Sequence, residues 1–537
     1  MADKMTSTGP SGRLTAEQEK FIHTLGDIVD FQSARQPGND AVVYGDRKMT
    51  FRDLQSVSNQ FANALVSEGF EPGTRVAFLD RNSEWFFPIL FGTAKANGTL
   101  VTVNFRLTPV EISYILGDSG AEIVCVGAEF LDNVKACRKD LPTLRKIIVI
   151  DGDGADNQGL ADWVASQSEA APARKVSPED TAVQMYTSGT TGHPKGVELT
   201  HNCMTAAAVD GLTVWPAMFR ENAAVLGIMP LFHIAAANLC IASLYAGGRA
   251  EIMRDGTPEQ IIRLIAERGI AVAPLPAAVI HEIIKLPFVS DLDLSCLDTL
   301  LIAGSGIPVE LLRQAQLTLK CGFALSYGMT ECCGGLTYLG PSDCTYDAGQ
   351  KLQSAGKPLG DNQVRILGPD GKELPVGETG EIACLSRRVM KGYWNRPEAS
   401  AEAMQDGWYL SGDAGYLDED GYLYVVDRIK DMVVSGGENI YPVEIENELI
   451  KHPAVDDVAV IGVPDPKWGE SLLACVVLSP GAEATPAELE QFLRGSLAGY
   501  KIPRRYDFVE SFPRNATGKV LKRVMRDERS QVQPAGE

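Results

Sequence analysis

The 537-residue sequence has no surplus of positive charge. It contains 49 Lys and Arg residues against 70 Asp and Glu residues, which gives a net charge of −21. Because nucleic-acid binding depends on basic side chains that neutralise phosphates, this balance argues against a nucleic acid as partner. Small phosphate ligands stay open, since local backbone N–H groups can hold an anion on an acidic protein.

Paired cysteines and long apolar runs are missing as well. The eleven cysteines form no CxxC pair and have no histidine spacing typical of zinc, so we expect reduced, buried thiols and a cytoplasmic location. The first twenty residues hold no apolar stretch of a secretory signal. Residues 222–248 contain no Asp, Glu, Lys or Arg, but Pro230 and a Gly-Gly break interrupt them. They predict a buried strand, a turn and a buried helix rather than a membrane span, and leave peripheral membrane contact open.

Short apolar strands alternate with helices over the first part of the chain. Thr50 and Asp53 are spaced as a capping box ahead of a helical stripe, and a second helix is expected to begin at Thr108-Pro109. The predicted strands are 75–79, 122–127 and 146–150. This alternation predicts largely parallel α/β layers, and a chain of this length predicts several lobes.

The character of the sequence changes twice further along. After Gly356 the chain predicts a β-hairpin that turns at Asp370-Gly371 and then more β structure, whereas residues 151–177 resemble a polar surface excursion. About a hundred C-terminal residues carry an α+β pattern of their own. We therefore predict a large N-terminal domain over 1–427, layered α/β with a small β-barrel-like part, and a small α+β domain over 428–537.

The stretch YTSGTTGHPKGVELTH, residues 186–201, concentrates hydroxyl groups and glycines before one lysine. Glycines allow a ligand to approach the backbone, and N–H groups with hydroxyls form an anion nest, to which Lys195 adds a point charge. The spacing differs from a Walker loop because Pro194 precedes the lysine, and GSGIPV at 304–309 lacks the third glycine of a dinucleotide fingerprint. A polyphosphate loop is favoured over a surface linker.

The same stretch resembles the phosphate loop of the adenylate-forming superfamily, which includes acyl-CoA synthetases, nonribosomal adenylation domains and firefly-type luciferases. Five further motifs follow in the family's order: SYGMTE (326–331), YLSGDAG (409–415), DRIKD (427–431), SGGENIYPVEIE (435–446) and PRNATGKVLKR (513–523). The resemblance extends from about Phe31 to Arg523. It implies a reaction in two halves, in which a carboxylate attacks the α-phosphate of ATP to give acyl-AMP and pyrophosphate, and a thiol then displaces AMP.

The resemblance implies roles for individual residues. Thr330 would contact the α-phosphate, Glu331 would bind Mg²⁺, and Asp413 would accept the ribose hydroxyls. Their alternatives are ordinary ones: a surface carboxylate for Glu331 and a turn residue for Asp413. The remaining nucleotide-binding residues are Thr187, Ser188, Gly189, Thr190, Thr191, Gly192, Lys195, Gly304, Ser305, Ser326, Tyr327, Gly328, Met329 and Arg428. Among these, Tyr327 could instead be a core tyrosine and Arg428 part of a surface ion pair.

Two poses of a mobile C-terminal domain are implied for the two half-reactions. Lys519 would bridge the carboxylate and the α-phosphate in the first pose, and the loop with Gly436 and Gly437 would admit the pantetheine arm of CoA in the second. Lys430 would be the hinge between the domains.

The sequence defines the carboxylic acid substrate less closely than it defines the reaction. The implied acyl pocket contains only small or uncharged residues: Ala235, Ala236, Ala237, Asn238, Ala303, Gly306, Gly328 and Met329. His233, either a pocket gate or a core histidine, lies beside them. Such a pocket permits a bulky or long apolar acid and disfavours an amino acid, but it does not separate a fatty acid from an aryl, cinnamoyl-type or steroid side-chain acid. Among these, we expect a medium- or long-chain fatty acid.

The acceptor is expected to be free CoA, with a carrier-protein phosphopantetheine as the alternative. A catalytically inactive nucleotide-binding regulator is a further possibility on the same fold, but Lys195, Glu331, Asp413 and Lys519 are all present. The expected partners are therefore the carboxylic acid, ATP and CoA, with a homodimer as an open option.

Overall fold

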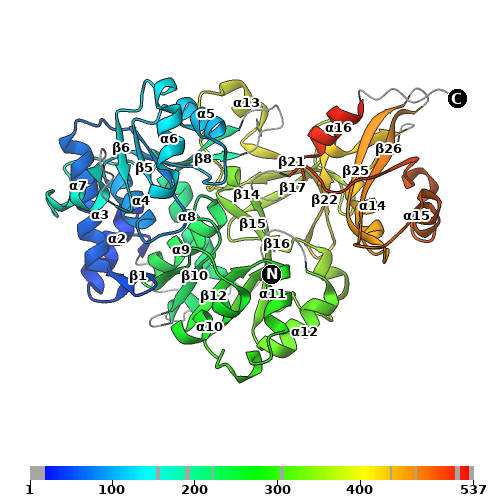
Figure 1. The fold of residues 1–537 in the computed structure, drawn as a ribbon, viewed down its shortest axis with the longest axis horizontal. Coiled ribbons are helices and arrows are strands. Elements are labelled where there is room, and N and C mark those ends of the chain that lie inside the picture. Colours follow the sequence, from blue (N-terminus) through cyan, green and yellow to red (C-terminus); the bar gives the residue numbers. More distant parts are fainter. Residues whose placement is uncertain are drawn as a thin grey trace. The chain divides into compact units, whose positions relative to one another are not determined.

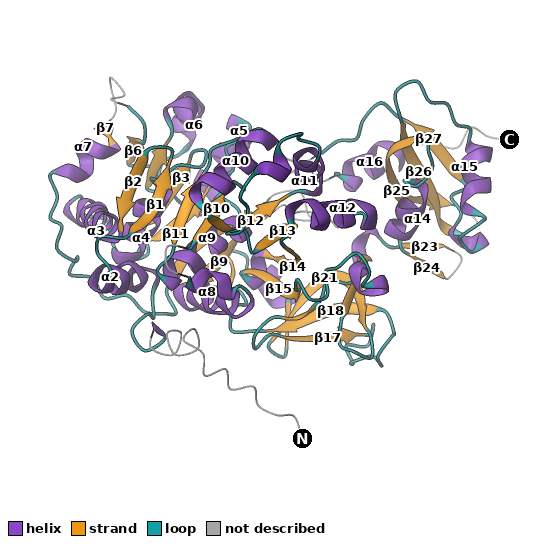
Figure 2. Cartoon of the chain, turned by 90° about the horizontal axis from the view of Figure 1, so that it is seen from below, coloured by secondary structure: helices purple, strands orange, loops and turns teal. Residues whose placement is uncertain are grey.

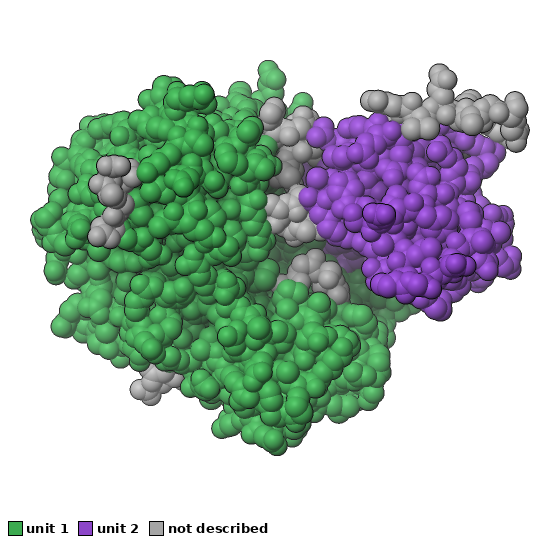
Figure 3. Space-filling view, in the orientation of Figure 1, with its two compact units in different colours: residues 1–363, 384–409 green, residues 364–383, 410–537 purple. Residues whose placement is uncertain are grey.

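The computed structural model describes residues 18–152, 158–187, 194–220, 223–302, 307–435, 438–465, 468–514 and 520–530. Figure 1 follows the chain from end to end, and Figure 2 distinguishes its helices and strands. The chain divides into two compact units (Figure 3). Unit 1 comprises residues 1–363 and 384–409, and unit 2 comprises residues 364–383 and 410–537. The predicted domain boundary at residue 427 does not coincide with this division and stays a prediction.

The first sheet of unit 1 carries the phosphate-loop strands near one edge. Its order is β19, β9, β8, β4, β3, β5, β6, β7, and the strands from β8 to β7 run parallel. The bounds in that order are Gly392–Tyr393, Lys195–Thr200, Thr181–Thr187, Thr99–Thr102, Arg75–Leu79, Ile123–Val126, Lys146–Val149 and Gln158–Gly159. The predicted strands at 75–79, 122–127 and 146–150 are thus confirmed.

The second sheet of unit 1 has nine strands in the order β16, β15, β14, β13, β12, β10, β11, β1, β2. It is parallel from β14 to β1 and antiparallel at both ends. The bounds in that order are Lys357–Pro358, Gly334–Leu339, Gly322–Met329, Thr299–Ile302, Ile270–Leu275, Ala224–Gly227, Arg249–Ile252, Asp40–Tyr44 and Arg47–Thr50. The predicted parallel layers are therefore present in both sheets.

Two buried helices lie between these sheets. Helix α8 packs on β8 and β9 of the first sheet, α9 packs on β10 and β11 of the second, and the two helices pack against each other (Figures 1 and 2). Because most residues of α9 are buried, its sequence can be apolar almost throughout, which explains the charge-free stretch. The helices of unit 1 are α2 Leu25–Arg35, α3 Phe51–Ser67, α4 Phe86–Lys95, α5 Pro109–Ser119, α6 Leu131–Cys137, α7 Leu160–Ala165, α8 His201–Val214, α9 Ile234–Ala246, α10 Pro258–Arg268, α11 Ala277–Ile284, α12 Val309–Leu319 and α13 Pro397–Glu402.

Local capping chemistry fixes where several helices begin. The Thr50 hydroxyl accepts from the backbone N–H of Asp53, whose carboxylate accepts from the backbone N–H of Thr50. Thr108 caps α5 in the same way and is followed by Pro109 at the first helical position. Both predicted starts are confirmed, because each cap satisfies N–H groups that have no partner inside the helix.

Unit 2 contains two smaller sheets. One is formed by β17 Gln363–Leu367, β18 Gly380–Leu385, β21 Trp408–Leu417 and β22 Leu423–Arg428. The first residues of β21, Trp408 and Tyr409, pair with β20 Met404–Gln405, and all four are counted with unit 1, as are Gln363, Cys384 and Leu385. The other has the order β24 Glu438–Ile440, β23 Val433–Ser435, β26 Gly469–Leu478, β25 Val455–Asp465, with β27 Arg505–Phe508 beside β26. Helices α14 Pro442–Leu449, α15 Pro486–Leu493 and α16 Lys522–Ser530 complete this α+β part. The turn at Asp370-Gly371 is present, with Gly371 at φ 75°.

The polar segment 151–177 differs from its prediction as a mere surface excursion. It contains α7, in which Leu160, Trp163 and Val164 are buried, and Trp163 packs edge-on against Phe61 with 5.3 Å between ring centroids. A tryptophan among polar residues was enough to anchor the segment to α3. Over the ranges described, no helix is long and apolar enough to span a membrane. Most of the cysteines are buried, as expected.

Candidate active site

The phosphate loop connects the two strands of an antiparallel hairpin. Strands β8 and β9 pair so that Thr187 is opposite Lys195, the residues on either side of the loop. Both side chains are partly exposed. The loop residues Ser188, Gly189, Thr190, Thr191 and Gly192 lie outside the described residues. The register nevertheless places Thr187 and Lys195 opposite each other, where strand β8 ends and strand β9 begins.

Glu331, which follows strand β14 of the second sheet, contacts this end of β8. It lies in a 3₁₀ turn, Thr330–Cys332, that follows β14, and it is only 9% exposed. Its Oε1 accepts a hydrogen bond from the Thr187 hydroxyl at 3.3 Å. The structure thus brings together two predicted ATP-site residues that are 144 positions apart in the sequence.

Two tyrosines are linked to this carboxylate: Tyr393, which lies outside the quoted motifs, and Tyr409, which opens the motif YLSGDAG. The Tyr393 hydroxyl donates to Glu331 Oε1 at 3.1 Å, and Tyr409 is hydrogen-bonded to Tyr393. Burial raises the pKa of Tyr393, and the charge of Glu331 raises it further. Tyr393 therefore stays protonated and can donate at neutral pH. No motif predicted it, because its strand β19 has only two residues.

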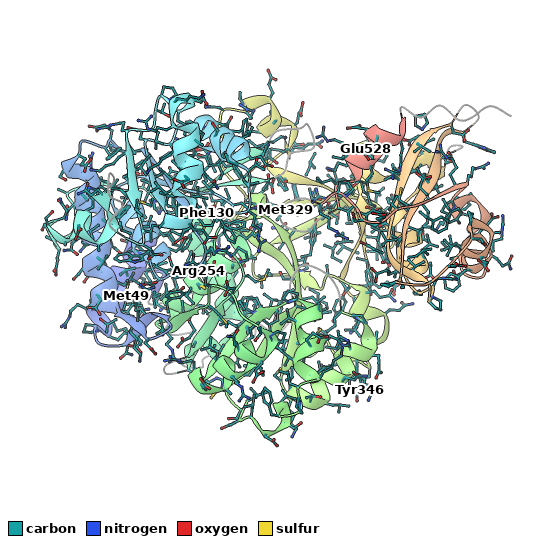
Figure 4. The ribbon with its side chains drawn as sticks, viewed as in Figure 1. Met49, Phe130, Arg254, Met329, Tyr346 and Glu528 are labelled. Atoms are coloured by element: carbon teal, nitrogen blue, oxygen red, sulfur yellow. The ribbon has the colours of Figure 1, made fainter. Side chains whose placement is uncertain are left out.

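The predicted adenine-side residues end strand β14. The Ser326 hydroxyl donates to the carbonyl of Thr337 at 2.8 Å, across the antiparallel pair of β14 and β15. Gly328 has no space for a side chain, because an added Cβ would lie 2.0 Å from the carbonyl oxygen of Gly334. Met329, labelled in Figure 4, is the last residue of the strand and leads into Thr330. Gly304, Ser305 and Gly306 lie outside the described residues, as does Ala303.

His233 is the residue that precedes helix α9. Its ring lies 4.5 Å from that of Phe232, and burial lowers its pKa to about 4, with a further contribution from the positive charge of Arg106. A histidine with this pKa is neutral at physiological pH, so it can accept or donate a hydrogen bond but does not supply a charge. The position fits both the gate and the core alternatives.

Asn82, which the sequence did not reveal, holds the turn that leads to His233. Its side-chain amide donates to the carbonyl of Met229 at 3.0 Å, and its Oδ1 accepts from the backbone N–H of Leu231 at 2.9 Å. The same amide also lies within hydrogen-bond distance of three further carbonyls, those of Gly227, Ile228 and Met253. Because Asn82 follows β3 of the first sheet, it ties that sheet to the turn of the second unit-1 layer that leads to His233.

The predicted acyl residues of α9 differ in exposure. Ala236 and Ala237 are buried, whereas Ala235 is exposed. Asn238 donates to the carbonyl of Cys333 at 2.7 Å. The turn after Glu331 is therefore fixed from α9 as well as by its own strand.

In unit 2, Asp413 and Arg428 bind each other. They are register partners on β21 and β22, and Arg428 Nε lies 2.6 Å from Asp413 Oδ1. Asp413 is 5% exposed, and its backbone N–H donates to the Ser411 hydroxyl. The ion-pair alternative for Arg428 is thus realised, although its partner is the predicted ribose ligand itself.

The other predicted residues of unit 2 lie in or beside loops. Lys430 belongs to a short 3₁₀ turn, Ile429–Asp431, between β22 and β23. Gly436 and Gly437 lie outside the described residues, between Ser435 and Glu438, which pair with each other. Lys519 also lies outside them, but Arg514 and Val520 on either side of its segment form an antiparallel bridge. In both motifs, the residues that flank the loop are therefore paired with each other.

The residues around Glu331 fit a magnesium ion better than a metal held by the protein alone. In the part of the chain that the structure describes, no three His, Cys, Asp or Glu side chains are grouped as a metal site. Mg²⁺ commonly binds through one or two carboxylates together with substrate phosphates. Glu331, with the Thr187 hydroxyl beside it and the phosphate hairpin adjacent, supplies this kind of donor set.

Comparison with known proteins agrees with this geometry. The family model of the AMP-binding enzyme matches residues 29–394, and that of the AMP-binding enzyme C-terminal domain matches residues 444–519. The fatty acid–[acyl-carrier-protein] ligase ScoC of Streptomyces coeruleorubidus is 38% identical over 511 residues, or 94% of this chain and 96% of that protein. A feruloyl-CoA synthase of an Amycolatopsis species is 38% identical over 503 residues, or 94% and 98%.

A solved structure extends the likeness to the fold. The Mycobacterium tuberculosis fatty acyl CoA synthetase superposes with a TM-score of 0.78 at 34% identity, covering 95% of this chain and 99% of that one. The chain belongs to the AMP-binding enzyme family, the adenylate-forming superfamily indicated by its motifs. Within that family it belongs to the acyl-CoA synthetase branch of acid–thiol ligases.

Proposed function

We propose that this protein is an ATP-dependent acid–CoA ligase that activates a medium- or long-chain fatty acid. An oxygen of the carboxylate attacks the α-phosphorus of ATP, the bond to the β-phosphate breaks, and pyrophosphate leaves. The thiol sulfur of CoA then attacks the acyl carbon, and AMP departs with the pair of electrons of the broken acyl–oxygen bond. The single observation that carries this proposal is the contact between Thr187 of the phosphate hairpin and Glu331 after β14.

That contact matters because the first half-reaction brings anions together. Lys195 and the N–H and hydroxyl groups of the hairpin would bind the terminal phosphates, which places the α-phosphate toward Thr330. Thr187 and Glu331 would hold Mg²⁺, which supplies charge neutralisation between the phosphates when bound. The neutral hydroxyls of Thr187 and Tyr393 both donate to the Glu331 carboxylate and stabilise its charge.

Each unit would contribute residues to the two half-reactions. Unit 1 carries the phosphate hairpin and the acyl helix α9, and unit 2 carries Asp413, Arg428 and the Lys519 segment. We propose that the chain rotates about Lys430, so that Lys519 serves adenylation and the Gly436-Gly437 loop serves thioester formation. Domains 1–427 and 428–537 would be the moving bodies. Because Arg428 Nε lies 2.6 Å from Asp413 Oδ1, a ribose at Asp413 would have to share this carboxylate with the guanidinium or replace it.

The fatty-acid assignment is supported by the apolar, uncharged character of α9. A buried amino-group ligand would require a carboxylate, and the pocket residues of α9 are alanines and one amide. The relative named feruloyl-CoA synthase supports an aryl acid as the second candidate, and ScoC supports a carrier protein as the second candidate for the acceptor. Both relatives are 38% identical to this chain, so identity alone does not separate them.

One assay separates the candidates. Purified protein with ATP and Mg²⁺ is given decanoate, palmitate, ferulate, a steroid side-chain acid or a neutral amino acid, and pyrophosphate release is measured. Free CoA or a phosphopantetheinylated carrier protein is then added, and AMP and thioester are measured. We expect the highest kcat/KM for a fatty acid and thioester formation with free CoA. Preference for ferulate, thioester only on the carrier, or no pyrophosphate with any acid would each contradict the proposal.

A further inference from the structure

Tyr393 contacts two residues of the proposed ATP site at once. The Nζ of Lys195 lies 4.6 Å from the centre of the Tyr393 ring, and the Tyr393 hydroxyl lies 3.1 Å from Glu331 Oε1. Lys195 belongs to the phosphate hairpin, and Glu331 is the proposed metal ligand. The ring of Tyr393 therefore contacts Lys195, the cation that would bind the terminal phosphates. Its hydroxyl contacts the carboxylate of Glu331, which would bind the metal.

The backbone around Tyr393 is fixed to the same hairpin. Tyr393 is opposite Val197 in the antiparallel pair of β19 and β9, the backbone N–H of Lys391 donates to Glu198 O at 2.9 Å, and that of Trp394 donates to Gly196 O at 2.7 Å. The backbone N–H of Tyr393 itself donates to the Ser400 hydroxyl at 2.8 Å. A strand of two residues would not persist alone, so these bonds attach it to β9.

The two contacts restrain groups that would otherwise be poorly oriented. A lysine ammonium is a point charge on a flexible four-carbon stem, and an aromatic face limits the positions it occupies. The Glu331 carboxylate can rotate, and donors from Thr187 and Tyr393 to one oxygen fix its plane and leave Oε2 to other ligands. Tyr409 is hydrogen-bonded to the Tyr393 side chain and so restrains its hydroxyl.

We propose that Tyr393 is a positioning residue that orients Lys195 and Glu331 jointly before Mg²⁺ and ATP bind. This inference rests on the proposed function, because it assumes that Glu331 binds the metal that accompanies ATP. The ring of Tyr393 would orient Lys195 for binding the phosphates, and its hydroxyl would orient Glu331 for binding the metal. The two parts of one side chain therefore have separable effects.

Equilibrium binding of ATP, measured by calorimetry without acid substrate, tests this separation. Affinity is determined once with Mg²⁺ and once with a chelator in place of Mg²⁺. Tyr393→Phe keeps the ring, so metal-free affinity should stay within about twofold, while Mg²⁺-ATP affinity should fall about fivefold or more from the loss of a hydrogen bond to a charged group. Tyr393→Leu removes the ring as well, so metal-free affinity should fall about threefold or more through the loss of the contact with Lys195.

Three reference variants make the outcome decisive. Glu331→Gln should reduce only the Mg²⁺-dependent affinity. Tyr409→Phe should move it in the same direction as Tyr393→Phe by a smaller factor, and it decides the question if Tyr393→Phe does not fold. Tyr245→Phe removes a buried hydroxyl of α9 that has no hydrogen-bond partner among the described residues, and it should change neither affinity.

The outcomes distinguish a failure of the proposed function from a failure of the positioning role of Tyr393. A wild-type protein that binds no ATP, or Glu331→Gln with an unchanged response to Mg²⁺, would overturn the proposed function or the metal role. A normal Mg²⁺ response in both Tyr393→Phe and Tyr409→Phe, alongside a reduced response in Glu331→Gln, would overturn the positioning role alone. Equal losses with and without Mg²⁺ in Tyr393→Phe would also contradict it, because they would indicate general disruption of the hairpin.

Discussion

Arg388 and Asp210 form an ion pair inside unit 1, with 3.1 Å between Nη1 and Oδ2. Their side chains are 3% and 5% exposed. The second terminal nitrogen of the guanidinium, Nη2, donates to the carbonyl of Cys333 at 3.0 Å. One arginine thus joins helix α8, the segment 384–409 and the turn that follows Glu331.

We predict that Arg388→Met destabilises the protein by about 3–5 kcal/mol, because it leaves the Asp210 carboxylate buried without its main partner. Arg387 lies 3.6 Å from the same carboxylate but is 42% exposed, so it should compensate only in part. Urea unfolding followed by tryptophan fluorescence measures the change. The control Arg313→Met breaks an exposed pair with Glu310 and should leave the free energy of unfolding almost unchanged. Equal losses in the two variants would contradict the prediction.

Removal of the Asn82 amide should weaken both the fold and the binding of the acid. We expect Asn82→Ala to cost about 1–3 kcal/mol, because buried carbonyls lose their donor. Since the amide holds the turn before His233, KM for the acid should rise more than KM for ATP. Asn63→Ala, which removes an exposed amide that binds two carbonyls, should cost about 0.5 kcal/mol or less. An unchanged ratio of the two KM values would show that Asn82 has no part in the acyl side.

His201 should make stability depend on pH. Burial lowers the pKa of this histidine to about 4, below its usual 6.5, while its Nδ1 accepts from the backbone N–H of Leu25. Between these values the unfolded chain binds more protons than the folded one, so stability is full above pH 6.5 and is lost as the pH falls toward 4. From pH 7 to pH 5 this group should account for about 2 kcal/mol.

The pH dependence is checked by denaturation of the wild type and of His201→Asn at both pH values. An asparagine keeps an acceptor near the Leu25 N–H but does not titrate, so the loss between pH 7 and pH 5 should shrink by about 2 kcal/mol. The exposed His23→Asn serves as the control and should leave the loss unchanged. The same loss in wild type and His201→Asn would mean that other groups dominate.

Lys519→Ala should abolish pyrophosphate release with ATP and the acid, yet retain thioester formation when acyl-adenylate is supplied with CoA. The reason is that the ammonium is proposed to neutralise charge only in the first half-reaction. Each half is measured separately, by pyrophosphate and by thioester. Similar losses in both halves would contradict the division of roles.

Gly437→Val should give the reciprocal result. A side chain at this glycine would obstruct the pantetheine arm but not the nucleotide, so adenylation should persist while thioester formation falls at least about tenfold. Loss of adenylation in this variant would indicate that the glycine loop is needed for the first half-reaction too.

Much of the local structure could be predicted because its causes are local. The helix at Phe51 begins where Thr50 and Asp53 cap it, and β3 occupies the apolar run that was predicted for it. Short-range periodicity failed at Trp163, where one large apolar side chain outweighed a polar neighbourhood. It also gave no sign of Tyr393, since a two-residue strand has no period and a tyrosine after glycine is not distinctive.

The sequence by itself determined the family, the order of the motifs and most helices and strands, because spacing, capping and apolar periodicity act over a few residues. Only the tertiary structure decided which side chains meet: Thr187 and Tyr393 at Glu331, Arg428 at Asp413, and Arg388 at Asp210. These contacts depend on sheet register and helix packing between segments far apart in the chain, and no local pattern encodes them.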